Sequence, residues 1–135
     1  MSDKTVRGFK FDAKIVLVTG GGSGICLAFV KQALDRGAKA IIIADLTLTP
    51  DAQTLLESSR DRVVFQETNV ADWKQLKALF ETSLQKFHDV PDVVCNGAGI
   101  FEPAWSNFWD DTEEERYASV DINLSAVIKL TRMAM

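Results

Sequence analysis

Residues 15–25 read IVLVTGGGSGI, an apolar run that ends in a glycine-rich turn and continues with helical spacing. Ile15 to Val18 are apolar and mostly β-branched, which is typical of a strand buried on both faces of a parallel sheet. The residues of the turn are Gly20, Gly21, Gly22, Ser23 and Gly24. Its glycines allow a close backbone approach to a ligand, and the helix that follows offers free N–H groups to a pyrophosphate. This stretch therefore predicts a strand, a phosphate-binding turn and a helix in succession.

The composition is that of one globular domain with a sizeable core. The chain has 135 residues, of which 47% are hydrophobic and 25% charged, and its formal net charge is −4. No apolar run is long enough for a membrane span, and the N-terminus lacks a signal-peptide core, so we expect a cytoplasmic protein without a membrane partner. The acidic balance and the absence of a Lys/Arg cluster argue against nucleic acid as a partner.

Two cysteines, Cys26 and Cys95, lie in apolar stretches and lack CxxC spacing. This pattern favours buried, reduced thiols over metal ligands or a disulfide. No metal site is predicted.

Strand-like and helix-like segments alternate along the chain, which predicts an α/β fold with a doubly wound parallel sheet. The expected strands lie near residues 15–18, 39–45, 62–67 and 92–96. Right-handed crossovers between them give the strand order 3-2-1-4. Residues 1–135 then form a single domain, truncated after strand 4 and its following helix, with strand 4 left as an open edge.

Helix starts are marked by capping patterns. Thr49 followed by Pro50 predicts an N-cap and the first residue of a short helix that ends near Ser58. Asp72 with Gln75 predicts a capping box. Thr112 with Glu115 has the same pattern and predicts the start of a long final helix.

Five motifs in this order resemble the first half of the short-chain dehydrogenase/reductase family. They are Thr19–Cys26 for its TGxxxGxG motif, Asp45 at the end of the second strand, Asn69-Val70 for its Asp-Val, Asn96–Gly99 for its NNAG, and Asn123 for the asparagine of its catalytic tetrad. The segment 101–132 looks most like the branch similar to NAD-dependent 15-hydroxyprostaglandin dehydrogenase. The resemblance implies a Rossmann-type NAD-binding fold and an oxidoreductase acting on a secondary alcohol or ketone.

The candidate cofactor-binding residues are Gly20, Gly22, Ser23, Gly24, Ile25, Asp45, Leu46, Asn69, Val70, Asn96, Gly97, Ala98 and Gly99. Asp45 can accept hydrogen bonds from both ribose hydroxyls, and it would repel the 2′-phosphate of NADP. Because Leu46 and the glycine turn offer no cation to offset that repulsion, we expect NAD. The alternative is a capping or surface aspartate.

Two asparagines have a binding interpretation and a structural one. Asn69 can face the N6 and N1 edge of adenine, keeping the acceptor of the family's aspartate and adding a donor, or it can merely turn the chain. Asn96 can tie its strand end to the Thr19 region while Gly97 to Gly99 pass under the nicotinamide ribose. Alternatively, this segment is only a turn.

The catalytic machinery is the least complete part of the pattern. In the family, the residue at Asn123 kinks its helix and holds a water that leads to the catalytic lysine, although a plain helix residue is an equal alternative. The family's catalytic serine and YxxxK dyad are not found, since Tyr117 is followed four residues later by Asp121. Cys26 also replaces a glycine where helix and strand pack closely. Enzyme activity of this chain alone therefore stays open.

Two further interpretations concern partners. Phe101, Trp105, Phe108 and Trp109 could line a pocket for a lipophilic alcohol or ketone, or anchor a loop. The chain could also be a catalytically inactive dinucleotide-binding or subunit-interaction protein, paired with itself or a full-length relative through Val127, Ile128 and Met133. A fragment of a longer protein is the third possibility.

Overall fold

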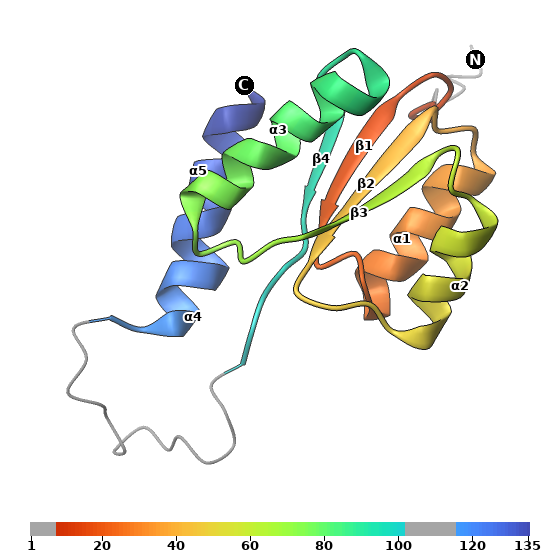
Figure 1. The fold of residues 1–135 in the computed structure, drawn as a ribbon. Coiled ribbons are helices and arrows are strands. Elements are labelled where there is room, and N and C mark those ends of the chain that lie inside the picture. The colour runs from red at the N-terminus through yellow and green to blue at the C-terminus, as the bar shows by residue number, and fades with distance from the viewer. Residues whose placement is uncertain (1–7, 102–115) are drawn as a thin grey trace, which may run out of the picture.

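A four-stranded parallel sheet forms the centre of the molecule (Figure 1). The computed structural model describes residues 8–101 and 116–135. The strands are β1 (Ile15–Thr19), β2 (Ala40–Asp45), β3 (Val63–Glu67) and β4 (Val93–Asn96). They pair in the order β3-β2-β1-β4, which confirms the predicted α/β fold and strand order.

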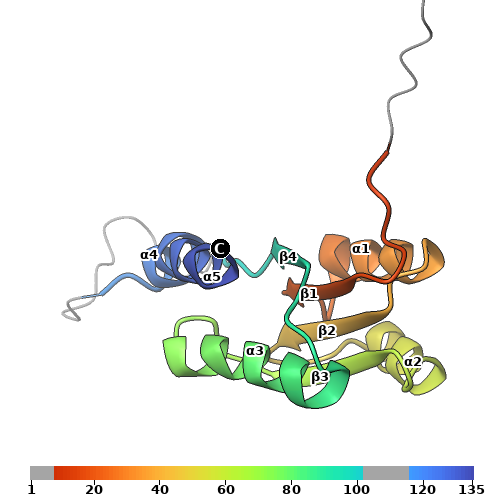
Figure 2. The ribbon, with the colours of Figure 1, turned by 90° about the horizontal axis from the view of Figure 1, so that it is seen from above.

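Helices cover both faces of the sheet, as the view from above shows (Figure 2). The helices α1 (Gly24–Asp35) and α2 (Pro50–Ser58) lie on one face. The other face is covered by α3 (Trp73–Phe87) and α5 (Ala126–Ala134). Val16 and Val18 pack toward α1, whereas Leu17 packs toward α3 and α5. Because both faces are covered, β1 and most of β2 are buried, which explains their unbroken apolar sequence.

The final helix differs from the prediction. It begins as α4 (Ala118–Val120), continues as a π-helical segment η1 (Asp121–Ser125) and ends as α5. Arg116 and Tyr117 are not helical, so the final helix does not run without a break from Thr112 as predicted. The Arg116 guanidinium, which precedes the helix, instead binds the carboxylate of Asp121 at 2.9 Å. Thr112 and Glu115 lie outside the described residues.

The start of β4 is tied to the start of β1 by one carboxylate. Asp92 Oδ2 accepts from the Ile15 N–H at 2.9 Å, and Asp92 Oδ1 accepts from Lys14 Nζ at the same distance. Both donors hold the pKa of Asp92 below its ordinary value, and the Ile15 N–H has a larger effect than the Lys14 ammonium.

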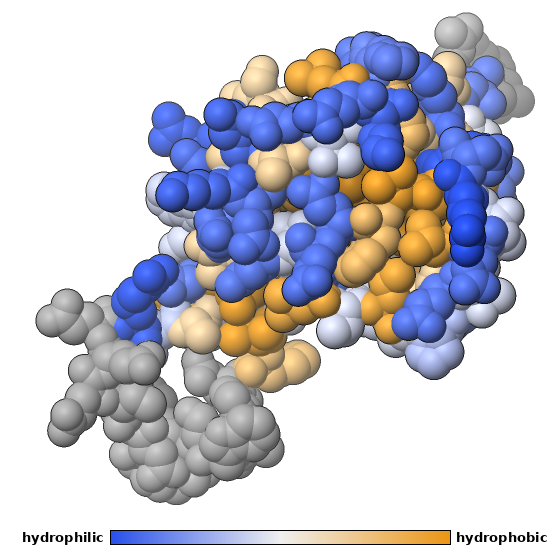
Figure 3. Space-filling view, in the orientation of Figure 1, coloured by the Kyte–Doolittle hydropathy of each residue, from blue (hydrophilic) through white to orange (hydrophobic). Residues whose placement is uncertain are grey.

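Polar side chains dominate the outer surfaces of the helices in Figure 3, and apolar side chains reach the surface over β3. None of the helices in residues 8–101 and 116–135 has the length and apolar character needed to cross a membrane.

Candidate cofactor site

The glycine turn after β1 touches the end of β4. Gly20 has φ +73°, a left-handed conformation that glycine adopts without strain. A Cβ at this position would lie 2.8 Å from the Ala98 backbone nitrogen, too close for any side chain. The Gly20 N–H donates to the Ala44 carbonyl of β2 at 2.8 Å. Three strand ends therefore meet at this turn.

The N–H groups at the start of α1 have no partner within the helix. Ser23 is the N-cap residue, but its side chain makes no capping hydrogen bond. The first bond of the helix runs from the Leu27 N–H to the Ser23 carbonyl at 3.0 Å, so the N–H groups of the first turn point out of the helix. The first turn carries no acidic side chain. This helix start is therefore free to bind an anion.

Asp45 is fixed beside the turn. Its Oδ2 accepts from the Gly22 N–H at 2.9 Å, and its Oδ1 accepts from the Leu46 N–H at 2.7 Å. A Cβ at Gly22 would overlap the Thr47 carbonyl oxygen and lie 2.8 Å from Asp45 Oδ2. Each carboxylate oxygen keeps a lone pair for a further donor, such as a ribose hydroxyl.

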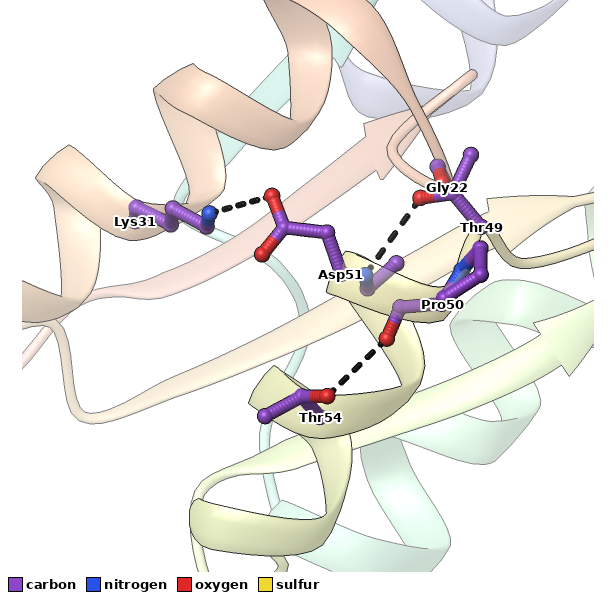
Figure 4. A network of polar contacts seen from close by, with 7 residues as sticks. Gly22, Lys31, Thr49, Pro50, Asp51 and Thr54 are labelled. Carbon is purple, nitrogen blue, oxygen red and sulfur yellow. Dashed lines mark hydrogen bonds and ion pairs between the residues drawn. The ribbon is translucent and has the colours of Figure 1, made fainter.

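The start of α2 supports the same turn from outside (Figure 4). Thr49 donates to the Gly22 carbonyl through its hydroxyl at 2.9 Å and through its N–H at 3.1 Å. The same hydroxyl accepts from the Ala52 N–H at 3.3 Å, as the predicted N-cap requires. An ion pair between Lys31 and Asp51, at 2.6 Å, joins α1 to α2.

The end of β4 is held by Thr19, which the sequence analysis placed in the motif but not among the cofactor-binding residues. Thr19 Oγ1 accepts from the N–H groups of Gly97, at 3.1 Å, and Ala98, at 3.2 Å. The prediction that Asn96 ties this strand end to Thr19 is wrong, because the Asn96 side chain donates to Thr131 of α5 at 3.2 Å. The β1–β4 register places Thr19 opposite Asn96 on the sheet face that α5 covers.

Cys26, which stands in place of a glycine of the resembled motif, touches Gly97 at the end of β4. A Cβ at Gly97 would overlap Cys26 Sγ, so the thiol fills the space that a side chain at Gly97 would need. This contact accommodates the larger residue in α1 without a clash against β4. Both cysteines are free and half-buried, and burial raises the pKa of Cys26 and of Cys95.

Asn123 joins the π-helical segment to the chain that follows β4. Its Oδ1 accepts from the Ile100 N–H at 2.8 Å, and its Nδ2 donates to the Ile100 carbonyl at 2.7 Å. Asn123 therefore has a structural role in this helix, and its catalytic role stays a prediction. The π-helical segment interrupts the regular helix at Asn123, where the resemblance implies a kink. Such π-helical turns are frequent at functional sites.

These elements border one cavity of about 570 Å³. The predicted residues that line it are Gly20, Ser23, Gly24, Ile25, Asp45, Leu46, Asn69, Val70, Gly97, Ala98 and Gly99. Three predicted residues do not line the cavity: Gly22, Asn96 and Asn123. Gly22 and Asn123 are hydrogen-bonded to the lining residues Asp45 and Ile100, respectively.

The lining also includes residues that the prediction omitted: Cys26, Ala44, Thr68, Ile100 and Ile122. Each adjoins a predicted residue in the sequence, so proximity to the motifs was the available signal. Phe101 lies at the cavity too, whereas Trp105, Phe108 and Trp109 fall outside the described residues.

A second hollow, of about 510 Å³, lies between α3 and α5 and is lined in part by Trp73, Lys129 and Arg132. It lacks the glycine turn, the helix start and the carboxylate of the first cavity. In the described part of the chain, no group of three or more His, Cys, Asp or Glu side chains could hold a metal ion.

Comparisons with known proteins agree with this geometry. A family model described as short chain dehydrogenase matches residues 14–135. The chain is 30% identical over 95 residues to the (+)-cis,cis-nepetalactol synthase NEPS3 of Nepeta racemosa, covering 70% of this chain and 35% of that protein. It is 28% identical over 133 residues to the short-chain dehydrogenase reductase 3a of Arabidopsis thaliana, covering 96% and 51% respectively. The chain thus spans about half or less of these relatives.

Among solved structures, a short chain dehydrogenase/reductase from Burkholderia phymatum in complex with NAD has a TM-score of 0.78 and 24% identity. The match covers 93% of this chain and 44% of that one. At this identity, the likeness establishes the fold.

Proposed function

Because the chain belongs to the short chain dehydrogenase family, we propose that it is the NAD-binding part of an oxidoreductase that acts on a secondary alcohol or ketone. The observation that carries this proposal is the Asp45 carboxylate, hydrogen-bonded to Gly22 within the glycine turn. When bound, the nicotinamide ring supplies the site that accepts or gives up a hydride.

Each part of the cavity has a proposed role toward the dinucleotide. The turn and the start of α1 bind the diphosphate through backbone N–H groups and Ser23. Asp45 accepts hydrogen bonds from the adenosine ribose hydroxyls. The Gly97–Gly99 segment, at the switch point between β1 and β4, supports the nicotinamide half.

The proposed cofactor is NAD and not NADP. A 2′-phosphate would lie against the Asp45 carboxylate, and the adjacent Leu46 side chain, 60% exposed, offers no positive charge. Isothermal titration of the purified chain should give tighter binding of NAD than of NADP. Asp45→Ala should weaken NAD binding about 10-fold or more, because it removes charge-assisted hydrogen bonds.

Asp61→Ala provides a matched control, since Asp61 is an exposed aspartate that precedes β3 at the opposite end of the sheet. It should leave NAD affinity unchanged. Equal NAD affinity in the Asp45 variant and the unmodified chain would refute the cofactor assignment.

The substrate proposal is a small lipophilic alcohol or ketone, as in the branch similar to 15-hydroxyprostaglandin dehydrogenase. Its support is the exposed Phe101 side chain, which lines the cavity. The 135-residue chain alone should not oxidise a secondary alcohol with NAD. Tyr117 is followed four residues later by Asp121, where the YxxxK dyad needs a lysine. NADH formation from any secondary alcohol by the sequence-verified chain would contradict this. Two free thiols support a cytoplasmic location.

A second candidate function is a non-catalytic interaction protein. It is favoured by apolar side chains exposed along the final helix, with Val120, Leu124 and Ile128 exposed by 46%, 55% and 53%. Such a surface could pair with a second copy or a full-length relative. Light scattering of the chain and of Ile128→Lys tests this, since a dimer that dissociates in the variant supports it and a monomer at all concentrations refutes it.

A further inference from the structure

The thiols of Cys26 and Cys95 lie in one layer, between α1 and the sheet. Cys95 pairs with Val18 in the register of β4 and β1, and Val18 belongs to the buried cluster on the face that α1 covers. Both cysteines pack against this cluster. Both are free, and neither is fully buried. Two thiols from different elements therefore lie on the same side of β4.

The direction of α1 brings these two thiols together. The helix joins the carboxyl end of β1 to the start of β2, so it runs back along the parallel strands from the edge that carries the glycine turn. Cys26, in its first turn, lies against Gly97, and Cys95 is two residues before Gly97, with its side chain on the face that α1 covers. Burial raises the pKa of both thiols, and their mutual contact raises that of Cys26 further while it partly offsets the shift of Cys95.

Cys26 is the thiol that the cavity exposes. It lines the cavity beside Ser23 and Gly24, whereas Cys95 is not part of the lining. A small reagent that enters the cavity therefore reaches Cys26 before Cys95. An accessible thiol with a second thiol next to it is the arrangement in which the first attacks a reagent and the second resolves the product.

We propose that Cys26 and Cys95 form a site at which a low-molecular-weight disulfide is reduced and an internal disulfide is formed. The Cys26 thiolate attacks one sulfur of the reagent, and the reagent's S–S bond breaks. This step leaves a mixed disulfide on Cys26 and releases one thiolate. The Cys95 thiolate then attacks Cys26 Sγ and releases the second thiolate.

The exchange balances without a further reactant. Two protein thiols are oxidised to one disulfide, and one reagent disulfide is reduced to two thiols. These thiols take up the two protons that Cys26 and Cys95 lose. The new bond joins the first turn of α1 to β4, two elements that meet beside the cavity. The redox state of the thiols then determines whether this contact is covalent.

The environment of the thiols affects both the rate and the equilibrium of this exchange. Burial, the Cys95 thiol and the Asp45 carboxylate, in this order of effect, raise the pKa of Cys26. Few thiolates therefore form at neutral pH, and the reaction is faster at mildly alkaline pH. Strongly oxidising dithiols favour their reduced form because a thiolate is stabilised, and these shifts are in the opposite direction. The internal disulfide is therefore stable once it has formed.

The test treats the folded chain with excess glutathione disulfide at mildly alkaline pH and follows the intact mass. The expected product has lost two hydrogen masses, and its peptide map links the peptide of Cys26 to that of Cys95. The same treatment in urea should lower the ratio of internal disulfide to doubly glutathionylated chain about 10-fold or more, because unfolding separates the two thiols. An equal ratio in both conditions would show that the fold does not hold the thiols together.

Two single substitutions separate the roles of the thiols. Cys95→Ala keeps the attacking thiol and should stop at one glutathione adduct on Cys26. Cys26→Ala is the matched control, and it should react more slowly, because Cys95 does not line the cavity. The proposal is overturned if the folded, unmodified chain ends as a glutathione adduct or a disulfide-linked dimer, or stays unchanged while the urea-unfolded chain reacts.

Discussion

Cys26 and Gly97 share one space between α1 and the end of β4. The thiol in α1 uses the space above the β4 backbone that a side chain at residue 97 would fill. Neither residue can be understood alone, because the size allowed at one depends on the other. The contact lies under the glycine turn, so it also affects how closely α1 approaches the sheet.

This contact predicts strong coupling between the two positions. Gly97→Asn should destabilise the chain by about 1–3 kcal/mol through overpacking. The same substitution should cost less in the Cys26→Gly background, where the thiol is gone. Urea unfolding of the four proteins measures the coupling, for which we expect about 1 kcal/mol or more. Additive effects would show that the two residues do not share this space.

The irregular final helix is the element that brings Asn123 to Ile100. Its π-helical segment ends where the regular α5 begins, and α5 contributes Ala126 and Leu130 to the core. The core residues anchor the helix on the sheet, and the two Asn123 bonds anchor the segment after β4 on the helix. That segment forms one wall of the cavity.

Removing these bonds should loosen the cavity wall. Asn123→Ala deletes one acceptor and one donor, with an expected loss of about 1–2 kcal/mol in unfolding free energy. The Ile100 amide should lose protection from hydrogen exchange. The β1 amides should lose only the protection that the lower unfolding free energy of the whole chain explains. Asn69→Ala serves as a control for losing an exposed asparagine. Unchanged exchange at Ile100 would contradict the role given to Asn123.

The hydrogen bonds of Asp92 at the starts of β1 and β4 make the stability of the chain depend on pH. The pKa of Asp92 is lowered in the folded chain, so its contribution to stability is present above the unfolded pKa of about 3.9. That contribution is lost as the pH falls through the lower folded value. Asp92→Asn should therefore be less stable than the unmodified chain at neutral pH, with the difference narrowing toward pH 3. Urea unfolding at several pH values measures it, and a constant difference would contradict this assignment.

At the scale of the whole molecule, the sequence predicted what depends on local pattern. Buried apolar runs located the strands, and Thr49 and Asp72 correctly marked two helix starts. The final helix start was misplaced because the Arg116–Asp121 contact is not evident from a capping pattern. The bonds from Thr19 to the end of β4 were missed, and the partner predicted for Asn96 was wrong. Both depend on the tertiary arrangement, since α5 covers the sheet face on which these side chains lie. The residues of the cavity were largely predictable, since parallel strands bring their carboxyl ends to one edge.

We propose that the glycine turn and the carboxyl ends of β2, β3 and β4 form one dinucleotide site. Titrating NAD into the isotope-labelled chain and following its backbone amide resonances tests this most directly. We expect the largest shifts at Gly20–Ile25, Asp45–Leu46, Asn69–Val70 and Gly97–Ile100, while Trp73 and Lys129 in the other hollow stay unaffected. Shifts confined to that hollow, or no shifts at millimolar NAD, would contradict it.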